Sequence, residues 1–223
     1  MGRMKIQNSP TIRRMPSYLH KLFNMRLEGK THVSTTELAK YMNIELIVVR
    51  KDIALTGIAG LRRVGYNIND LIDYIKNYLG WTQTFSACLI GAGALGTAIL
   101  GYEDFVNYGL NIQSVFDCSE QKIGTSIHGR EVYDINTIGQ RFKHYHPDMA
   151  IICVSNTAAQ SVTDKIIQIG IRYIWNFANV CLQVPPRVIV QREVLAGGLA
   201  TLTVKMKQMN EHDEEKGNIE EKK

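Results

Sequence analysis

The sequence predicts an α/β protein: an N-terminal winged helix-turn-helix, then a Rossmann-like doubly wound parallel sheet, then a C-terminal apolar helix. Three observations support this prediction. Residues 1–79 contain short amphipathic helical patterns, and residues 84–190 alternate strand-like apolar runs with helical ones. A glycine motif, Gly91-Ala92-Gly93-Ala94-Leu95-Gly96, lies between a strand-like run and a helical run. The segment 191–209 is the expected C-terminal helix.

The composition is that of a soluble globular protein in the cytoplasm. Of its 223 residues, 45% are hydrophobic and 21% are charged. No apolar run approaches the ~18 residues of a membrane span, and the N-terminus lacks the apolar core of a signal peptide. The four cysteines form no C-x-x-C pair, and Cys118 is left open as a redox thiol or an inert side chain.

Charge is unevenly distributed along the chain. Residues 1–79 contain 13 Lys or Arg against 6 acidic residues, a net charge of +7, whereas residues 80–223 have a net charge of −2. A basic N-terminal block on a near-neutral body indicates that the first domain meets a polyanion.

The N-terminal block is expected to begin with a basic arm of about 15 residues, followed by helices. A helical pattern with one apolar face runs from Tyr18 to about Leu27, and Gly29 ends it. Ser34 and Glu37 have the spacing of a capping box, which predicts the start of a short second helix.

Two further helices flank a short hairpin. Asn43 is expected to cap a third helix from about Ile44 to Leu55, and a fourth helix runs from about Asn69 to Leu79. Between them, Gly60–Tyr66 has the composition of a hairpin loop and carries two arginines.

Three short helices and a basic hairpin are typical of a winged helix-turn-helix, whose third helix enters the DNA major groove while the wing contacts backbone or minor groove. Arg50 and Lys51 lie on the third helix and suit phosphate or guanine contacts. A structural helical bundle with a solvated basic face is the alternative reading of this segment. The residues expected to contact double-stranded DNA are Ser34, Arg50, Lys51, Arg62, Arg63 and Tyr66.

The glycine motif predicts a dinucleotide site. It follows the strand-like run 85–90 and opens a helix expected from Leu95 to Tyr108. The first glycine makes the turn, the second admits a pyrophosphate, and the third packs helix on strand. Asp117 ends the next strand-like run, 21 residues beyond Gly96, where a carboxylate accepts from the ribose 2′-OH of NAD and repels the 2′-phosphate of NADP.

The remaining alternation completes the predicted sheet after a linker at 80–84. Apolar runs at 149–154, 172–177 and 187–190 are expected strands, and a helix is expected from about Ser155 to Ile169. Ligands bind beyond the carboxyl ends of such strands, so the turns after the strands form one cleft. The cleft residues expected to bind NAD(H), besides the glycine motif and Asp117, are Val154, Ser155, Asn156, Asn176 and Phe177.

The C-terminal helix is expected to pack on a second subunit. Leu195, Leu199, Leu202 and Met206 recur at helical intervals after a domain that is already complete. The segment 210–223 is charged and is expected to be disordered.

Several motifs follow one another along the chain in a specific order and spacing. They are Arg14-Met15-Pro16, Val49-Arg50-Lys51-Asp52, Val64-Gly65-Tyr66-Asn67, Gly91–Leu100 with Tyr102, Phe116-Asp117, Lys122-Ile123-Gly124 and Asn176-Phe177. Through these motifs the chain resembles the Rex family of bacterial redox-sensing transcriptional repressors, over nearly the whole span from Thr11 to Met206. The resemblance implies a homodimer with exchanged C-terminal helices that binds operator DNA when NADH is scarce. It adds Lys122 and Tyr102 to the cofactor site. It also implies a redox relay of Arg14 in the DNA-binding domain, Tyr102 near the nicotinamide, and Glu193 from the partner subunit.

The chain departs from that family pattern in four features. The third helix continues Ile53-Ala54-Leu55-Thr56 in place of Phe-Ser-Tyr-Phe, and Arg63 replaces a glycine. The motif at 176–179 lacks its usual proline, and Glu193 replaces an aspartate. A divergent paralogue with another operator or an altered redox response is therefore an alternative.

Other functions are weaker readings of the sequence. A small NAD-dependent dehydrogenase would need a substrate domain that the chain has no room for, so no catalytic residue is assigned. A DNA-binding module with a vestigial nucleotide site is a third possibility. His144 and His146 lack the ligand spacing of a metal site, so no metal is expected.

Overall fold

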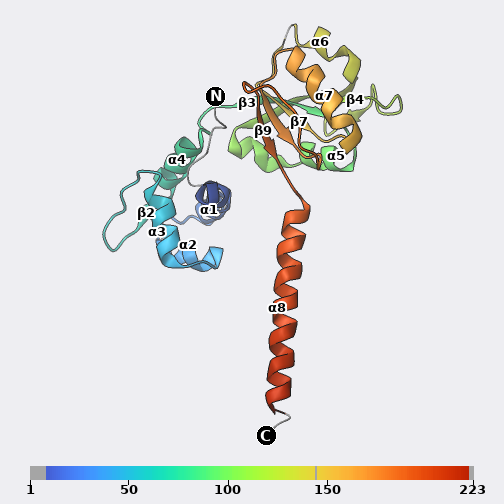
Figure 1. The fold of residues 1–223 in the computed structure, drawn as a ribbon. Helices are drawn as coiled ribbons and strands as arrows, with labels where there is room; N and C mark the ends of the chain where they lie inside the picture. Colours follow the sequence, from blue (N-terminus) through green and yellow to red (C-terminus); the bar gives the residue numbers. More distant parts are fainter. Residues whose placement is uncertain (1–8, 144, 221–223) are drawn as a thin grey trace. The chain divides into compact units, whose positions relative to one another are not determined.

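The computed structural model describes residues 9–143 and 145–220, with the backbone alone beyond residue 212. The chain divides into two compact units (Figure 1). The first contains the chain through Phe85 together with Glu103–Asn111, and the second contains Ser86–Tyr102 and everything from Ile112 onward.

The first unit is helical, with a small two-stranded sheet. Its helices pack around one apolar core to which Tyr18, Leu22, Val49, Ile53 and Ile75 contribute fully buried side chains. Strand β1 pairs antiparallel with β2, so that His32 lies opposite Asn67. The elements are α1 (Ser9–Leu27), β1 (His32–Val33), α2 (Thr35–Met42), α3 (Leu46–Ala54), β2 (Tyr66–Asn67) and α4 (Ile68–Leu79).

The expected helices of this unit are present, with corrected boundaries. Helix α1 begins at Ser9, so much of the expected basic arm is helical, because Thr11 and Met15 are buried against the core. Asn43 does not cap α3. It ends α2 in the left-handed conformation (φ 51°), and Glu45 precedes α3.

Two other helix termini follow from short polar side chains. The capping box at Ser34 and Glu37 is confirmed, since each side chain binds the other residue's backbone N–H. Asn67 accepts from the backbone N–H groups of Asn69 and Asp70 at the start of α4, and Gly80 ends that helix with φ 74°.

The second unit is built on a seven-stranded sheet of order β5-β6-β4-β3-β7-β8-β9. Neighbours β4 and β6, β3 and β7, β7 and β8, and β8 and β9 are parallel, whereas β5 and β6 form an antiparallel hairpin. Strand order reverses between β3 and β7, which is the switch point of a doubly wound sheet. The strands are β3 (Phe85–Ile90), β4 (Leu110–Asp117), β5 (Ser126–Ile127), β6 (Arg130–Asp134), β7 (Met149–Ile152), β8 (Tyr173–Asn176) and β9 (Ile189–Arg192).

Helices connect these strands and cover a continuous apolar core. Cys88 and Ile152 from the sheet and Ile166 from α7 are fully buried in it. The connecting elements are α5 (Ala94–Leu100), η1 (Glu103–Tyr108), η2 (Ile135–Thr137), α6 (Ile138–Arg141) and α7 (Asn156–Gln168).

The prediction of a single helix from Leu95 to Tyr108 was wrong. The chain instead forms α5 and then the 3₁₀ helix η1, with a break at Gly101. A Cβ at Gly101 would lie 2.6 Å from Nε2 of His128, so a larger residue here would require the His128 ring to move. Within the first unit, η1 places Tyr108 against Trp81, with ring centroids 5.0 Å apart.

Helix α8 (Ala196–Glu220) is longer than the sequence predicted. Its backbone continues as far as Glu220 into the segment expected to be disordered, because Glu and Lys favour helix and no proline interrupts them. Six large apolar side chains on or just before it are more than half exposed within this single chain: Leu195, Leu199, Leu202, Val204, Met206 and Met209.

Candidate nucleotide site and DNA-binding surface

The glycine loop after β3 has the backbone geometry that its motif requires. Gly91 has φ 98°, and a Cβ there would lie 2.6 Å from the carbonyl oxygen of Cys153. A Cβ at Gly96 would lie 1.9 Å from the carbonyl oxygen of Gly91. Larger residues are therefore excluded at both positions, and the loop after β3 contacts the turn after β7 at the switch point.

The second glycine has a different environment. A Cβ at Gly93 would meet no atom within 4 Å, so the backbone faces open space at this point. Gly93 precedes α5 and offers no side chain to bind the N–H groups at the start of that helix. These are the features that let a pyrophosphate approach the loop.

Asp117 ends β4 beside this loop and is only 8% exposed. Its Oδ2 accepts from the backbone N–H of Ala92 at 2.7 Å and lies 3.3 Å from Nζ of Lys122, while Oδ1 accepts from the N–H of Ser119 at 2.9 Å. Burial alone would raise the pKa of Asp117, but the two N–H groups and the ammonium hold this pKa below its usual value. The carboxylate is therefore charged at neutral pH.

The turns after β7 and β8 are tied to each other. Asn156 accepts at Oδ1 from the N–H of Asn179 at 2.8 Å. Asn176 is fully buried, and its side-chain amide binds Ala178 and Val180 within its own loop. The cofactor role expected for Asn176 is thus matched by a structural one, because its side chain holds the loop that carries Phe177.

The other expected cofactor residues border these turns. Val154 and Ser155 follow β7 directly, and the Ser155 hydroxyl lies 3.0 Å from that of Thr157. Tyr102 follows α5 and is about half exposed. The strands that carry the turns are parallel neighbours, so their carboxyl ends share one edge of the sheet.

In the first unit, α3 divides its side chains between core and surface. Val49, Asp52 and Ile53 are buried, whereas Arg50 and Lys51 are exposed. The two expected DNA-contacting cations of this helix therefore project from its exposed side.

The wing is a short loop closed by the bridge between Leu61 and Gly65. Arg63 has φ 66°, the left-handed conformation that favours glycine, which accounts for the glycine of the family pattern at this position. Gly65 has φ 98°, and a Cβ there would lie 2.3 Å from the carbonyl oxygen of Val33. Arg62 and Arg63 are exposed in this loop, and Tyr66 follows it in β2.

A buried carboxylate joins α1 to α3 in the same unit. Asp52 is 1% exposed and accepts from Nε and Nη2 of Arg14 at 2.6 and 2.8 Å. It also accepts from the hydroxyl groups of Thr11 at 2.7 Å and Tyr18 at 2.8 Å. Burial would raise the pKa of Asp52, but the hydrogen bonds from Arg14, Thr11 and Tyr18 lower it.

Sequence reasoning missed this role of Asp52. A usable signal was present, because Thr11, Arg14 and Tyr18 recur at intervals of three and four and so share one face of α1. Two buried hydroxyl groups and a guanidinium on a core-facing helix stripe require an acceptor.

The residues of the expected relay have partners within their own units. Arg14 pairs with Asp52, whereas Glu193, just after β9, accepts at Oε1 from Nε1 of Trp175 at 3.2 Å and from Nε2 of Gln191 at 3.1 Å. Within the described residues, Nη1 of Arg14 has no hydrogen-bond partner, and the Arg14 side chain is 28% exposed.

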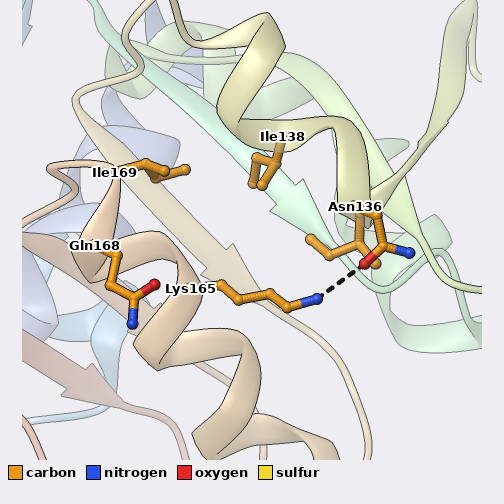
Figure 2. Close-up of a pocket in the computed structure, with 6 residues that line it drawn as sticks. Asn136, Ile138, Lys165, Gln168 and Ile169 are labelled. Carbon is orange, nitrogen blue, oxygen red and sulfur yellow. Dashed lines mark hydrogen bonds between the residues drawn. The ribbon is translucent and has the colours of Figure 1, made fainter.

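A separate cavity of about 170 Å³ lies between the η2–α6 segment and α7 (Figure 2). Lys165 donates to Oδ1 of Asn136 at 3.0 Å across it. Small-molecule sites usually occupy ~300–1,000 Å³, so this cavity is too small for a dinucleotide. None of its lining residues belongs to the glycine loop.

Across the residues that the structure describes, no cluster of three or more His, Cys, Asp or Glu side chains has metal-binding geometry, and His144 lies outside them. Among the described helices, none combines the length and apolarity needed to traverse a bilayer. Cys118, beside Asp117, is exposed.

Two known families match separate parts of the chain. Residues 8–54 match the family described as "Putative DNA-binding protein N-terminus", and residues 82–180 match the family described as "CoA binding domain".

Curated relatives match nearly the whole chain. The redox-sensing transcriptional repressor Rex of Treponema denticola is 40% identical over 206 residues, covering 92% of this chain and 98% of the relative. The protein of the same name from Desulfitobacterium hafniense is 38% identical over 203 residues, covering 91% and 96%.

Solved structures agree in fold. RSP, described as a Rex-family repressor, has been crystallised with beta-NAD⁺ and operator DNA. That complex superposes with a TM-score of 0.81 at 30% identity, over 96% of this chain and 99% of RSP. Its complex with beta-NADH also has a TM-score of 0.81, at 29% identity, over 95% and 99%.

Proposed function

This chain belongs to the Rex family of redox-sensing transcriptional repressors, and from that membership we propose that it represses transcription by binding operator DNA and releases the DNA when it binds NADH. One observation carries the proposal. A single chain combines a glycine loop at the switch point of a doubly wound sheet with a separate basic unit whose helix α3 exposes Arg50 and Lys51.

The residues of the second unit fit NAD(H). The open space at Gly93 admits the pyrophosphate, and a ribose hydroxyl would donate to the charged carboxylate of Asp117 at the end of β4. Lys122 holds that carboxylate in place. We propose that Val154, Ser155 and Asn156 line the same cleft from β7, and that Asn176 acts by fixing the loop that carries Phe177.

The dinucleotide acts here as a signal. Its nicotinamide ring is cationic in NAD⁺ and neutral in NADH, so the two forms interact differently with neighbouring side chains. A ligand shifts a conformational equilibrium only through such a difference in affinity for the two states. We propose that Tyr102 senses this difference beside the ring and that Glu193 of the partner subunit and Arg14 transmit it.

We propose that Arg14 takes part through Nη1. Its Nε and Nη2 are committed to Asp52, so the carboxylate of Glu193 would approach through Nη1. Arg14 would then link the relay to α3 without losing its bond to Asp52. We further propose that the protein works in the cytoplasm as a homodimer joined by α8.

The decisive experiment is a gel shift with duplex DNA from upstream of the protein's own gene, with and without NADH. We expect the protein to form a complex with this DNA that migrates more slowly than free DNA. NADH should dissociate the complex, and NAD⁺ should leave it intact. When the protein is incubated with NADH alone, it should bind NADH tightly without oxidising it. Loss of the NADH effect, with DNA binding intact, would favour the divergent paralogue, and NADH oxidation would favour a dehydrogenase.

A further inference from the structure

Helix α3 exposes a stripe that is mostly aliphatic. Its exposed residues recur at positions i, i+3, i+4, i+7 and i+8, which is one face of an α-helix. They are Ile47, Arg50, Lys51, Ala54 and Leu55. Ile47 is 51% exposed and Leu55, at the C-terminal cap, is 40% exposed, so these large alkyl groups lie outside the core.

The core does not need these side chains. Val49 and Ile53 supply the apolar side of α3 that packs inward, and both are fully buried. The acidic side chain at this level of the helix, Asp52, is buried and bonded to Arg14. The exposed stripe therefore combines alkyl groups with two cations and no carboxylate.

The charge of this stripe identifies its occupant as DNA. Arg50 and Lys51 lie between Ile47 and Leu55, and the wing adds Arg62 and Arg63 in the same basic unit. An apolar surface on another protein would satisfy the alkyl groups but leave the cations without partners. A nucleic acid groove offers both phosphates and base edges.

Only one alkyl group lies on the major-groove edge of the four standard bases, namely the 5-methyl of thymine. Guanine presents two acceptors that suit Arg or Lys, and adenine and cytosine present polar groups. An isoleucine or leucine at this edge would desolvate any of those polar groups without compensation. Its favourable neighbour is a thymine methyl.

Resting on the proposed function, we infer that Ile47, supported by Ala54 and Leu55, reads thymine 5-methyl groups, while Arg50 and Lys51 contact guanine or phosphate. The operator half-site would then contain thymines whose methyl groups, and not only their hydrogen-bonding edges, contribute to affinity. Ile47 lies in the first turn of α3, the part of a recognition helix that contacts base edges.

Deoxyuridine tests this inference because it differs from thymidine only by that methyl group. The full-length protein would select duplexes from a random pool. The best duplex would then be resynthesised with deoxyuridine at each thymine in turn. We expect at least one substitution to weaken binding about four-fold, the value of one buried methyl group.

The variants I47A and L55A should bind more weakly, and at least one should bind the thymine and deoxyuridine duplexes equally at the sensitive position. Both side chains are substantially exposed, so neither change should unfold the helix. Y74A, which removes an exposed aromatic ring from α4, is the matched control and should keep the deoxyuridine effect.

The outcomes separate this inference from the proposed function. Enrichment of a duplex that tolerates deoxyuridine at every position would overturn the inference alone. So would a deoxyuridine effect that persists unchanged in both I47A and L55A. A protein that retains no duplex from the pool at low salt would overturn both.

Discussion

At the scale of single residues, two buried carboxylates organise the two units. Asp117 joins the end of β4 to the glycine loop, and Asp52 joins α3 to α1. Each has a lowered pKa despite burial, because donors converge on it. Charged groups are rarely buried unless they are paired, so each of these carboxylates marks a place where two elements must hold a fixed relation.

The Asp117 carboxylate should determine cofactor choice. Asp117→Ala removes the acceptor for the ribose hydroxyl, so NADH affinity should fall about tenfold or more, as for a hydrogen bond to a charged group. NADPH affinity should fall much less, because a repulsive charge is lost as well. Fluorescence titration with both reduced cofactors measures this.

Two further variants sharpen the Asp117 test. Asp117→Asn keeps an acceptor for loop hydrogen bonds but removes the charge, and should narrow the preference for NADH over NADPH. Asp164→Ala removes an exposed acid of α7 and should change neither affinity. Equal affinities for NADH and NADPH in the unaltered protein would contradict the role assigned to Asp117.

The Asp52 network should make the stability of the first unit depend on pH. Asp52→Asn leaves the guanidinium of Arg14 without its carboxylate and should lower the free energy of unfolding by about 3 kcal/mol. This value is toward the lower end for broken buried ion pairs, because the Arg14 side chain is 28% exposed. A lowered folded-state pKa means that Asp52 contributes its stability above the unfolded value of about 3.9.

That contribution is lost as the pH falls through the folded-state pKa. The difference in melting temperature between wild type and Asp52→Asn should therefore be large at pH 7 and shrink toward pH 3. Thermal denaturation followed by circular dichroism would measure it. A difference that stays constant over this range would show that the charge of Asp52 is unimportant to the network.

At the scale of elements, short polar side chains and glycines made most helix boundaries predictable, and tertiary contacts changed the rest. The Ser34 capping box and the glycine loop follow local rules that the sequence displays. Helix α1 starts nine residues earlier than predicted because burial of Thr11 and Met15 depends on α3 and the core. The ring of His128, which is distant in sequence, lies beside Gly101 at the break between α5 and η1.

The wing should contribute affinity without sequence preference. Arg62 lies exposed in the loop closed by Leu61 and Gly65, and we propose that it contacts phosphate. Arg62→Ala should weaken binding to all duplexes about equally and reduce the slope of log K against log salt by about 1. Fluorescence anisotropy at several salt concentrations gives both quantities.

Arg172→Ala provides the control for the Arg62 variant, since it removes an exposed arginine from the second unit. It should leave the salt slope unchanged. If Arg62→Ala altered the preferred sequence instead of the slope, the wing would be reading bases, and the phosphate role of Arg62 would be wrong.

At the scale of the whole molecule, the proposed signal must connect the two units. Glu193 accepts a hydrogen bond from Trp175 within the second unit. In the first unit, Arg14 binds Asp52 through Nε and Nη2, which leaves its Nη1 for a further acceptor. Glu193→Gln removes the charge that would attract Arg14 but keeps the length of the side chain. It should leave NADH affinity largely intact while reducing NADH-induced DNA release several-fold, as expected for a coupling of ~1–3 kcal/mol.

The relay is checked by titrating NADH into the preformed DNA complex of each variant. Glu193→Asp restores a charge on a shorter side chain and should recover part of the response. Release by Glu193→Gln at the wild-type NADH concentration would mean that the signal travels by another route.

In a single chain, the described apolar side chains of helix α8 have no core to pack against. Leu195, Leu199, Leu202, Met206 and Met209 recur at alternating intervals of four and three, the spacing of a helix seam, and all are exposed here. Monomeric proteins rarely expose so continuous an apolar stripe, so a second copy is its expected cover.

Light scattering of the full chain should therefore give a dimer at micromolar concentration. Leu199→Glu together with Leu202→Glu buries two unpaired charges in that interface and should yield monomers or aggregates, since each such charge costs several kcal/mol. Gln208→Glu adds a charge away from the seam and should leave the dimer intact. A stable dimer in the double variant would place the interface elsewhere, and the route from Glu193 of one subunit to Arg14 of the other would have to be redrawn.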